Sequence, residues 1–218
     1  MRKQPMISIY TVFNTYPLSF LREAIHGVRK QTYDNTEYIF VIYGKDNDLS
    51  GILKTVAIID GNIKIYYKPD IDNFIKAIKY ATSKCSGEYV CRADSEDILL
   101  DTAIEEMVKY KEDMIIPNHI SIDNDGSILD TDVKGNIHNI SSNCLIRKKL
   151  VEQTKYHDIQ TCRDGYAILK KIQHSNFTLR YLDKPLFKYR ENPGSITNNS
   201  RSKETIAFNE GLVDGLYM

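Results

Sequence analysis

Residues 38–43, Tyr38-Ile39-Phe40-Val41-Ile42-Tyr43, are apolar without a break. A strand with one exposed face alternates apolar and polar side chains, whereas a strand that is apolar throughout is covered on both faces, as in a parallel sheet. Shorter runs of this kind recur along the first half of the chain, and between them apolar residues fall at helical spacing. The predicted strands are Met6–Val12, Tyr38–Tyr43, Ile63–Tyr67, Tyr89–Ala93 and Met114–Ile116, and the predicted helices are Ser19–Lys30, Gly51–Ile59, Ile71–Ala81 and Ala103–Val108. This alternation predicts an α/β fold with a mostly parallel central sheet and helices on both faces.

After about residue 117 the pattern becomes mixed. Asn124-Asp125-Gly126 stands between two strand-like runs, which predicts a hairpin over Ser121–Leu129. The remaining pattern predicts strands at Ser142–Arg147, Leu179–Leu182 and Leu186–Tyr189, and helices at Tyr166–Ile172 and Lys203–Leu216. We therefore expect a single domain over residues 1–218, with a sheet-and-helix half up to about residue 117 and a small mixed α+β lobe over about 118–218.

The composition excludes several classes of partner. Lys and Arg together number 29 and Asp and Glu also number 29, so the chain lacks the basic surplus with which proteins bind nucleic acid. No apolar run reaches the length of a membrane span, and the basic start Met1–Pro5 leads into a strand-like run rather than a signal-peptide core. The four cysteines form no C-x-x-C pair, which indicates reduced thiols. We expect a cytoplasmic protein with at most a peripheral contact to the inner face of the membrane.

One strand end carries a cluster of acids. Asp94, Glu96 and Asp97 follow the strand predicted at Tyr89–Ala93, at the edge of the sheet where open α/β folds bind ligands. Carboxylates this close repel one another, and Mn²⁺ or Mg²⁺ would relieve the repulsion. The alternative is a solvated, acid-rich start of the next helix, with Asp101 as its cap. Glycine-rich phosphate loops, dinucleotide fingerprints and a nucleophile elbow do not occur in the sequence.

Several short motifs follow one another in an informative order. Ile7-Ser8-Ile9 leads to Phe13-Asn14, Leu21-Arg22-Glu23-Ala24-Ile25 leads to Gln31-Thr32-Tyr33, and Gly87-Glu88-Tyr89 precedes the acidic cluster; then come Asn143–Arg147, Arg163-Asp164 and Tyr189-Arg190 followed by Ser195-Ile196-Thr197. In this order and spacing they resemble the family 2 glycosyltransferases, which have the GT-A (nucleotide-diphospho-sugar transferase) fold. The resemblance covers about residues 6–200, and the acidic cluster is similar to the Met-Asp-x-Asp-Asp-Ile motif of bacterial surface-polysaccharide enzymes.

The resemblance implies an inverting transfer of a sugar from a nucleotide-diphospho-sugar, with a UDP-sugar as the expected donor, to a hydroxyl of a glycan or lipid-linked acceptor. Residues up to about 117 would then bind the donor and the remainder would face the acceptor. The implied metal is Mn²⁺ or Mg²⁺ on the diphosphate, held by Glu96 and Asp94, and the implied general base is Asp164. A role for Asp164 as the N-cap of the next helix is equally compatible with the sequence, and the two roles can coexist. The implied nucleotide-sugar site comprises Thr11, Phe13, Asn14, Tyr43, Arg92 and Asp94, and the loops beside donor and acceptor contain Asp97, Arg163, Tyr189 and Arg190.

The chain also departs from the family pattern. Tyr43-Gly44 stands where relatives carry the acid that binds uracil, Ile78 stands near the place of a phosphate-binding residue, and Glu96 replaces an Asp. Tyr43 could stack on a base or simply end a strand. The departures leave open a second interpretation, a catalytically impaired GT-A-like scaffold that binds a glycan or a partner subunit. Separately, a homo-oligomer is compatible with the sequence. A nucleotidyltransferase is a third, but the glycine-rich basic loop of such enzymes is missing.

Overall fold

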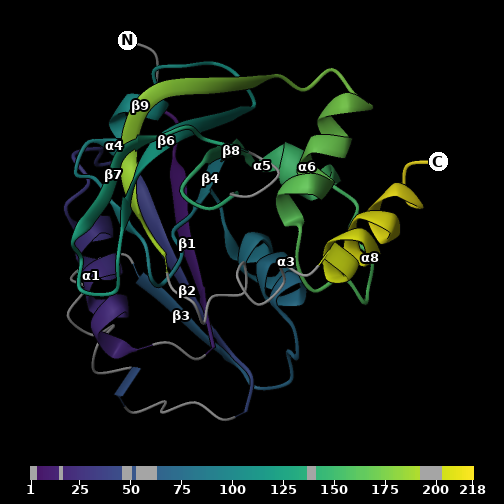
Figure 1. Ribbon diagram of the computed structural model, residues 1–218, viewed down its shortest axis with the longest axis horizontal. Helices are drawn as coiled ribbons and strands as arrows, with labels where there is room; N and C mark the ends of the chain where they lie inside the picture. The colour runs from purple at the N-terminus through teal and green to yellow at the C-terminus, as the bar shows by residue number, and fades with distance from the viewer. Residues whose placement is uncertain (1–3, 15–16, 46–50, 53–62, 137–140, 192–202) are drawn as a thin grey trace.

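Figure 1 shows the computed structural model of the 218-residue chain. The structure describes residues 4–14, 17–45, 51–52, 63–136, 141–191 and 203–218. Its strands are β1 (Ile7–Phe13), β2 (Thr36–Tyr43), β3 (Ile63–Lys68), β4 (Tyr89–Arg92), β5 (Ile98–Leu99), β6 (Met114–Ile122), β7 (Ile128–Val133), β8 (Leu145–Arg147) and β9 (Leu179–Arg190). Its helices are α1 (Leu18–Arg29), α3 (Phe74–Lys84), α4 (Ala103–Met107), α5 (Lys148–Gln153), α6 (Asp164–Gln173) and α8 (Lys203–Asp214).

The described strands form one nine-stranded sheet. Its order is β3-β2-β1-β4-β8-β6-β9-β5, and β7 pairs with β6 beside this path. The strands β3, β2, β1 and β4 are parallel to one another, as predicted for the first half. The second half adds β8 antiparallel to both β4 and β6, and β9 parallel to β6. Strands from both halves of the chain therefore share one sheet.

The central strand β2 is buried on both faces, as its unbroken apolar run predicts. Tyr38, Phe40 and Ile42 enter the core on the side of α1 and α4, and Ile39, Val41 and Tyr43 enter the core on the side of α3, α5 and α6. In Figure 1, α1 lies to the left of the sheet and α3, α6 and α8 lie to its right. The two clusters explain why β2 contains no polar side chain after Glu37.

Two of the motif residues, Gln31 and Gly87, are explained by contacts within the fold. The Gln31 side chain donates to the carbonyls of Gly27 and Leu100 at 3.0 and 2.8 Å and accepts from the backbone N–H of Ile104 at 3.0 Å, so it joins the end of α1 to the start of α4. At Gly87 a Cβ atom would lie 2.6 Å from the backbone nitrogen of Ser8, so no larger residue fits there. Both residues serve the fold.

The second half differs from the prediction at one strand and one helix, since α5 was not predicted. The hairpin after β6 is present, with Ile122 opposite Ile128 and Gly126 at a φ of +86° in its turn. The two strands predicted at Leu179–Leu182 and Leu186–Tyr189 are one continuous strand, β9. Pro185 between them lies opposite Asn118, where the register with β6 shifts, because proline has no N–H for the ladder. The helix predicted at Gly51–Ile59 lies outside the described residues except for Gly51 and Ile52, which are helical.

In the part of the chain that the structure describes, no helix has both the length and the apolar character needed to cross a bilayer.

Candidate functional site

The site lies where the order of the strands reverses. The chain passes from β1 to β2 and β3 on one side and then returns to β4 on the other side of β1. The connections that leave β1 and β4 therefore diverge, and the carboxyl ends of such strands are where open α/β sheets bind ligands. Asn14 follows β1 here, and Asp94 follows β4.

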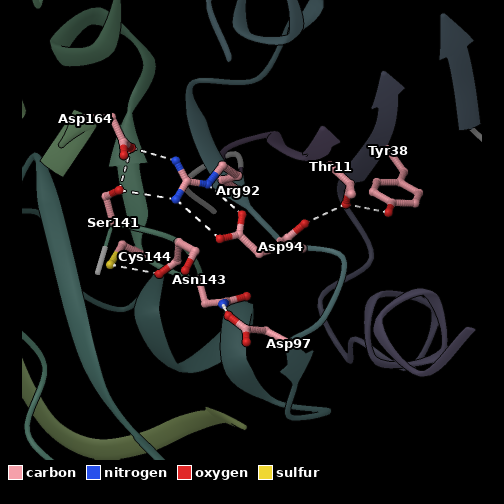
Figure 2. A network of polar contacts seen from close by, with 11 residues as sticks. Thr11, Tyr38, Arg92, Asp94, Asp97, Ser141, Asn143, Cys144 and Asp164 are labelled. Atoms are coloured by element: carbon pink, nitrogen blue, oxygen red, sulfur yellow. Dashed lines mark hydrogen bonds and ion pairs between the residues drawn. The ribbon is translucent and has the colours of Figure 1, made fainter. Parts of the chain in front are cut away.

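The Arg92 side chain occupies the centre of this region and joins two carboxylates (Figure 2). Its Nε donates to Asp94 Oδ1 at 2.7 Å, and its Nη1 donates to Asp164 Oδ2 at 2.6 Å. Its Nη2 lies 3.3 Å from the hydroxyl of Ser141 and 3.4 Å from Asp94 Oδ2. Asp94 and Asp164 are 70 positions apart in the sequence, and one guanidinium group brings them together.

The charge of Arg92 is retained although the side chain is buried. Only 6% of the residue is exposed, and its guanidinium carbon lies 5.0 Å from the centre of the Phe74 ring. Burial alone lowers the pKa of Arg92, but the carboxylates of Asp164 and Asp94 reverse this effect and hold the pKa well above its usual value. Arg92 is therefore a fixed cation that the protein itself neutralises, and its role as a direct ligand of the nucleotide sugar stays a prediction.

Asp164 is the first residue of α6, and the protein bonds one of its two carboxylate oxygens. Ser141 Oγ donates to Asp164 Oδ2 at 2.5 Å, the same oxygen that Arg92 contacts. Within the described residues, Asp164 Oδ1 has no hydrogen-bond partner. The Asp164 side chain keeps 12% of its surface exposed. One carboxylate oxygen is thus fixed by the protein, and the other is available to a ligand.

The turn before Asp164 depends on the C-terminal helix. Arg163 has a φ of +65°, which is unusual for a residue other than glycine, and its guanidinium forms an ion pair with Glu210 on α8. Asn209 Oδ1 accepts from the backbone N–H groups of Thr161 and Cys162 at 2.9 and 3.4 Å. The predicted loop residue Arg163 therefore joins the turn to α8.

The acidic cluster after β4 does not act as a unit. Both oxygens of Asp94 contact Arg92, and 28% of the Asp94 side chain is exposed. Asp97 is internal, because its Oδ2 accepts from Asn143 Nδ2 at 2.8 Å and its Oδ1 accepts from the backbone N–H of Arg190 at 3.1 Å. Burial, together with the charges of Asp94 and Glu96, holds the pKa of Asp97 well above its usual value. Both oxygens of Asp97 thus bond within the protein, and its predicted place in a loop beside donor and acceptor stays a prediction.

Arg190 and Tyr189 also serve the fold. Arg190 is fully buried, and its guanidinium donates to the carbonyls of Glu96, Asp123 and Asn124 and to the carboxylate of Glu23. It therefore connects the acidic turn, the β6–β7 hairpin and α1. The Tyr189 ring packs against His119, with ring centres 5.4 Å apart.

The predicted donor-site residues on β1 and β2 divide into two groups. Thr11 is fully buried, and its hydroxyl donates to the carbonyl of Ala93 at 2.7 Å and lies 2.7 Å from the hydroxyl of Tyr38. Phe13 is also internal and stacks on Phe40 in the core. The side chains of Thr11 and Phe13 thus support the fold, and their contact with a nucleotide sugar stays a prediction.

Tyr43 and Asn14 lie on the side of Asp94. Burial and, to a smaller degree, the nearby charge of Asp94 raise the pKa of Tyr43 to about 12. A hydrogen bond with Asn14 offsets part of this rise. Gly44 has a φ of +85°, and a Cβ atom there would lie 3.0 Å from Asn14 Oδ1. Asn14 and Asp94 thus lie close to the Tyr43 side chain, on one side of the site.

The described part of the site offers few protein ligands for a divalent cation. Among the described residues, no three His, Cys, Asp or Glu side chains gather closely enough to enclose a metal. Asp97 has no free carboxylate oxygen, and Asp94 is paired with Arg92. Glu96 is buried beside these acids, with 9% of the residue exposed. Mg²⁺ typically uses one or two carboxylates plus phosphate oxygens, and the role of Glu96 as such a ligand stays a prediction.

A family model decides what kind of protein this is. The model described as glycosyl transferase family 2 matches residues 9–172, which run from β1 into α6 and include Asp94, Glu96 and Asp164. The chain belongs to glycosyl transferase family 2. This membership confirms the family that the motifs indicated.

Relatives in glycosyl transferase family 2 include two bacterial proteins. Glycosyltransferase GlyA of Streptococcus pneumoniae serotype 4 is 24% identical over 221 residues, which cover 88% of this chain and 31% of GlyA. The O-antigen biosynthesis glycosyltransferase WbnJ of Escherichia coli is 29% identical over 106 residues, which cover 48% of this chain and 41% of WbnJ. The matched segments thus cover less than half the length of each of these relatives.

A solved structure identifies the fold of this family 2 member. Residues 1–349 of TarS from S. aureus, in complex with UDP-GlcNAc, match 97% of this chain and 70% of that chain with a TM-score of 0.69 and 14% sequence identity. The fold is GT-A, as the resemblance implied.

Three residues of the site were not predicted from the sequence. Ser141 bonds Asp164, Asn143 bonds Asp97, and Asn209 holds the turn before Asp164. Ser141 and Asn143 lie in or beside a motif that we identified only as a strand. Asn209 has no local signal, since nothing in its neighbourhood indicates that α8 packs against α6.

Proposed function

We propose that this chain catalyses an inverting glycosyl transfer from a nucleotide-diphospho-sugar to an acceptor hydroxyl. The observation that carries the proposal is the sharing of Arg92 by Asp94 and Asp164. It sets an acid at the end of β4 beside an acid that can accept a proton. Inverting transfer needs a group that holds the donor and a base that takes the proton of the acceptor. The leaving diphosphate and the attacking hydroxyl lie on opposite faces of one sugar carbon, so the two groups must be held close together.

Asp164 is the proposed general base. Its Oδ1 takes the proton of the acceptor hydroxyl while the hydroxyl oxygen attacks the anomeric carbon. The bond from that carbon to the diphosphate oxygen breaks on the opposite face, and its electron pair leaves with the nucleoside diphosphate. The configuration of the carbon is inverted, and Asp164 keeps the proton.

The donor side is assigned to Asp94, Asn14, Tyr43 and Glu96. The complexes of TarS with UDP and UDP-GlcNAc support a UDP-sugar as the donor. Mn²⁺ or Mg²⁺, when bound by Glu96 and the diphosphate, would neutralise the charge of the leaving group. The name of WbnJ supports an acceptor in surface-polysaccharide synthesis, that is, a glycan or a lipid-linked sugar.

The test uses the purified chain with Mn²⁺ and a panel of UDP-, GDP- and dTDP-sugars, and it measures release of the nucleoside diphosphate. Water can replace an unknown acceptor, so slow donor hydrolysis is the minimal expected result. Asp164→Asn should lower the rate by about 10²- to 10⁴-fold, the usual contribution of a general base, while binding of UDP is kept. Asp158→Asn is the matched control, because Asp158 is an exposed acid in the loop before α6.

The alternative of a binding scaffold predicts a different outcome. Tyr43-Gly44 in place of an acidic ligand favours it. If the parent chain binds UDP but shows no turnover of any donor, the scaffold interpretation replaces ours. If Asp164→Asn turns over donor as fast as the parent, Asp164 is not the base.

A further inference from the structure

The contacts around Asp164 form a closed set of three side chains. Arg92 Nη1 and Ser141 Oγ both donate to Asp164 Oδ2, at 2.6 and 2.5 Å, and Arg92 Nη2 also lies 3.3 Å from Ser141 Oγ (Figure 2). All three residues are at least nine-tenths buried. Two donors on one oxygen restrict rotation of the carboxylate, so the direction of Oδ1 is determined by residues outside α6.

Arg92 is itself held rigidly. Its carbonyl oxygen accepts from the backbone N–H of Asn143 at 2.6 Å, and its guanidinium lies over Phe74 while Nε donates to Asp94. A planar guanidinium can bond two carboxylates in fixed directions at once, which the ammonium group of a lysine cannot reproduce. Ser141 lies just before Asn143, so one short segment contacts both Arg92 and Asp164.

We propose that Arg92 and Ser141 are positioning residues that orient Asp164 toward the acceptor hydroxyl. The proposal rests on the proposed function of Asp164 as the base. Neither residue touches the reacting atoms. Arg92 also links the base to Asp94 on the donor side, whereas the hydrogen bonds of the Ser141 hydroxyl to described residues go to the base and Arg92. Ser141 therefore allows the orientation of Asp164 to be tested without a change on the donor side.

The experiment compares kcat and the donor KM of four variants in the donor-turnover assay. Ser141→Ala should lower kcat about 10-fold and leave the donor KM within about twofold, because a small misorientation of a catalytic group slows the chemical step. Arg92→Lys should lower kcat about 100-fold and raise the donor KM, since Asp94 loses its partner as well.

Matched controls separate positioning from a general loss of stability. Ser8→Ala removes another buried serine that bonds a carboxylate, that of Glu37. Ser8 and Glu37 lie at the amino ends of β1 and β2, away from the site at the carboxyl ends of the strands. Arg147→Lys alters another arginine that bonds two carboxylates, those of Asp113 and Glu88. Both controls should lower the unfolding temperature without changing kcat or KM.

The outcomes are distinct. A Ser141→Ala variant with the parent's kcat would overturn the positioning role, provided that Asp164→Asn is inactive. Equal losses of kcat in Ser141→Ala and Ser8→Ala would also overturn it, because the effect would then follow stability alone. If the parent or Asp164→Asn contradicts the proposed function, this inference falls with it, and the Asp164→Asn result tells the two failures apart.

Discussion

Asn143 Nδ2 donates a 2.8 Å hydrogen bond to Asp97 Oδ2, which ties the segment before β8 to the acidic turn after β4. Asn143 is 1% exposed and adopts a φ of +56°, a conformation that few residues other than glycine tolerate. Its side-chain oxygen is buried and has no partner among the described residues. Asp97 thus connects the acidic turn to Asn143 and to the end of β9, and substitutions of Asp97 should change the stability of the fold.

Asp97→Asn should cost less than about 1 kcal/mol of unfolding free energy. Because burial raises the pKa of Asp97, an uncharged amide of the same shape is tolerated, and Asn143 can rotate its amide to accept the new N–H group. Asp97→Ala should cost about 2–4 kcal/mol, because it leaves the Arg190 N–H and Asn143 Nδ2 buried without partners. Urea unfolding checks both values, and equal losses in the two variants would contradict this account.

Asn209→Ala should loosen the turn that carries Asp164. Asn209 Oδ1 is the acceptor for the N–H groups of Thr161 and Cys162, and the loss of a buried acceptor costs about 1–3 kcal/mol. Hydrogen exchange of those two amides should accelerate, and donor turnover should fall while UDP affinity is kept. Asn176→Ala, at an exposed position, is the control. Unchanged exchange at Thr161 would show that α8 does not hold the turn.

Glu37 should make folding stability depend on acidic pH. Burial raises its pKa, but hydrogen bonds from Lys64, Ser8 and Ser86 outweigh this and lower the pKa from 4.5 to about 2. A lowered pKa in the folded state means that the stabilisation is complete above pH 4.5 and is lost as the pH falls toward 2. The difference amounts to about 3 kcal/mol.

Glu37→Gln provides the measurement. Urea unfolding between pH 2 and 7 should show a gap between parent and variant that is widest near neutral pH and narrows between pH 4.5 and 2. A gap that stays constant with pH would mean that the carboxylate has the same pKa in the folded and unfolded chain.

Glu96→Gln should weaken the response to metal. If Glu96 is the main protein ligand of the cation, the Mn²⁺ concentration for half-maximal donor turnover should rise at least about tenfold, since an amide is a poorer ligand than a carboxylate. Asp97→Asn is the matched control, because both oxygens of Asp97 are already bonded within the protein. An unchanged Mn²⁺ dependence in Glu96→Gln would remove Glu96 from the metal site.

Much of the first half of the fold was predictable because β1, β2 and β4 are short and mostly apolar, and the helices α1 and α3 have a periodicity of their own. The strands β1 to β4 and the helices α1 and α3 lie within a few residues of their predicted positions. The single strand β9 was not predictable, because Pro185 interrupts its local pattern while pairing with β6 continues on both sides.

The sequence by itself determined the parallel core and the residue types of the site, since apolar period and motif order are local properties of the chain. Only the tertiary structure decided which acids lie together. Asp94 and Asp164 meet through Arg92, whereas Asp97, only three residues after Asp94 in the sequence, turns inward to Asn143 and Arg190. The direction of a buried side chain depends on partners brought from distant segments, and a contact between residues 92 and 164 has no signature in the residues on either side of them.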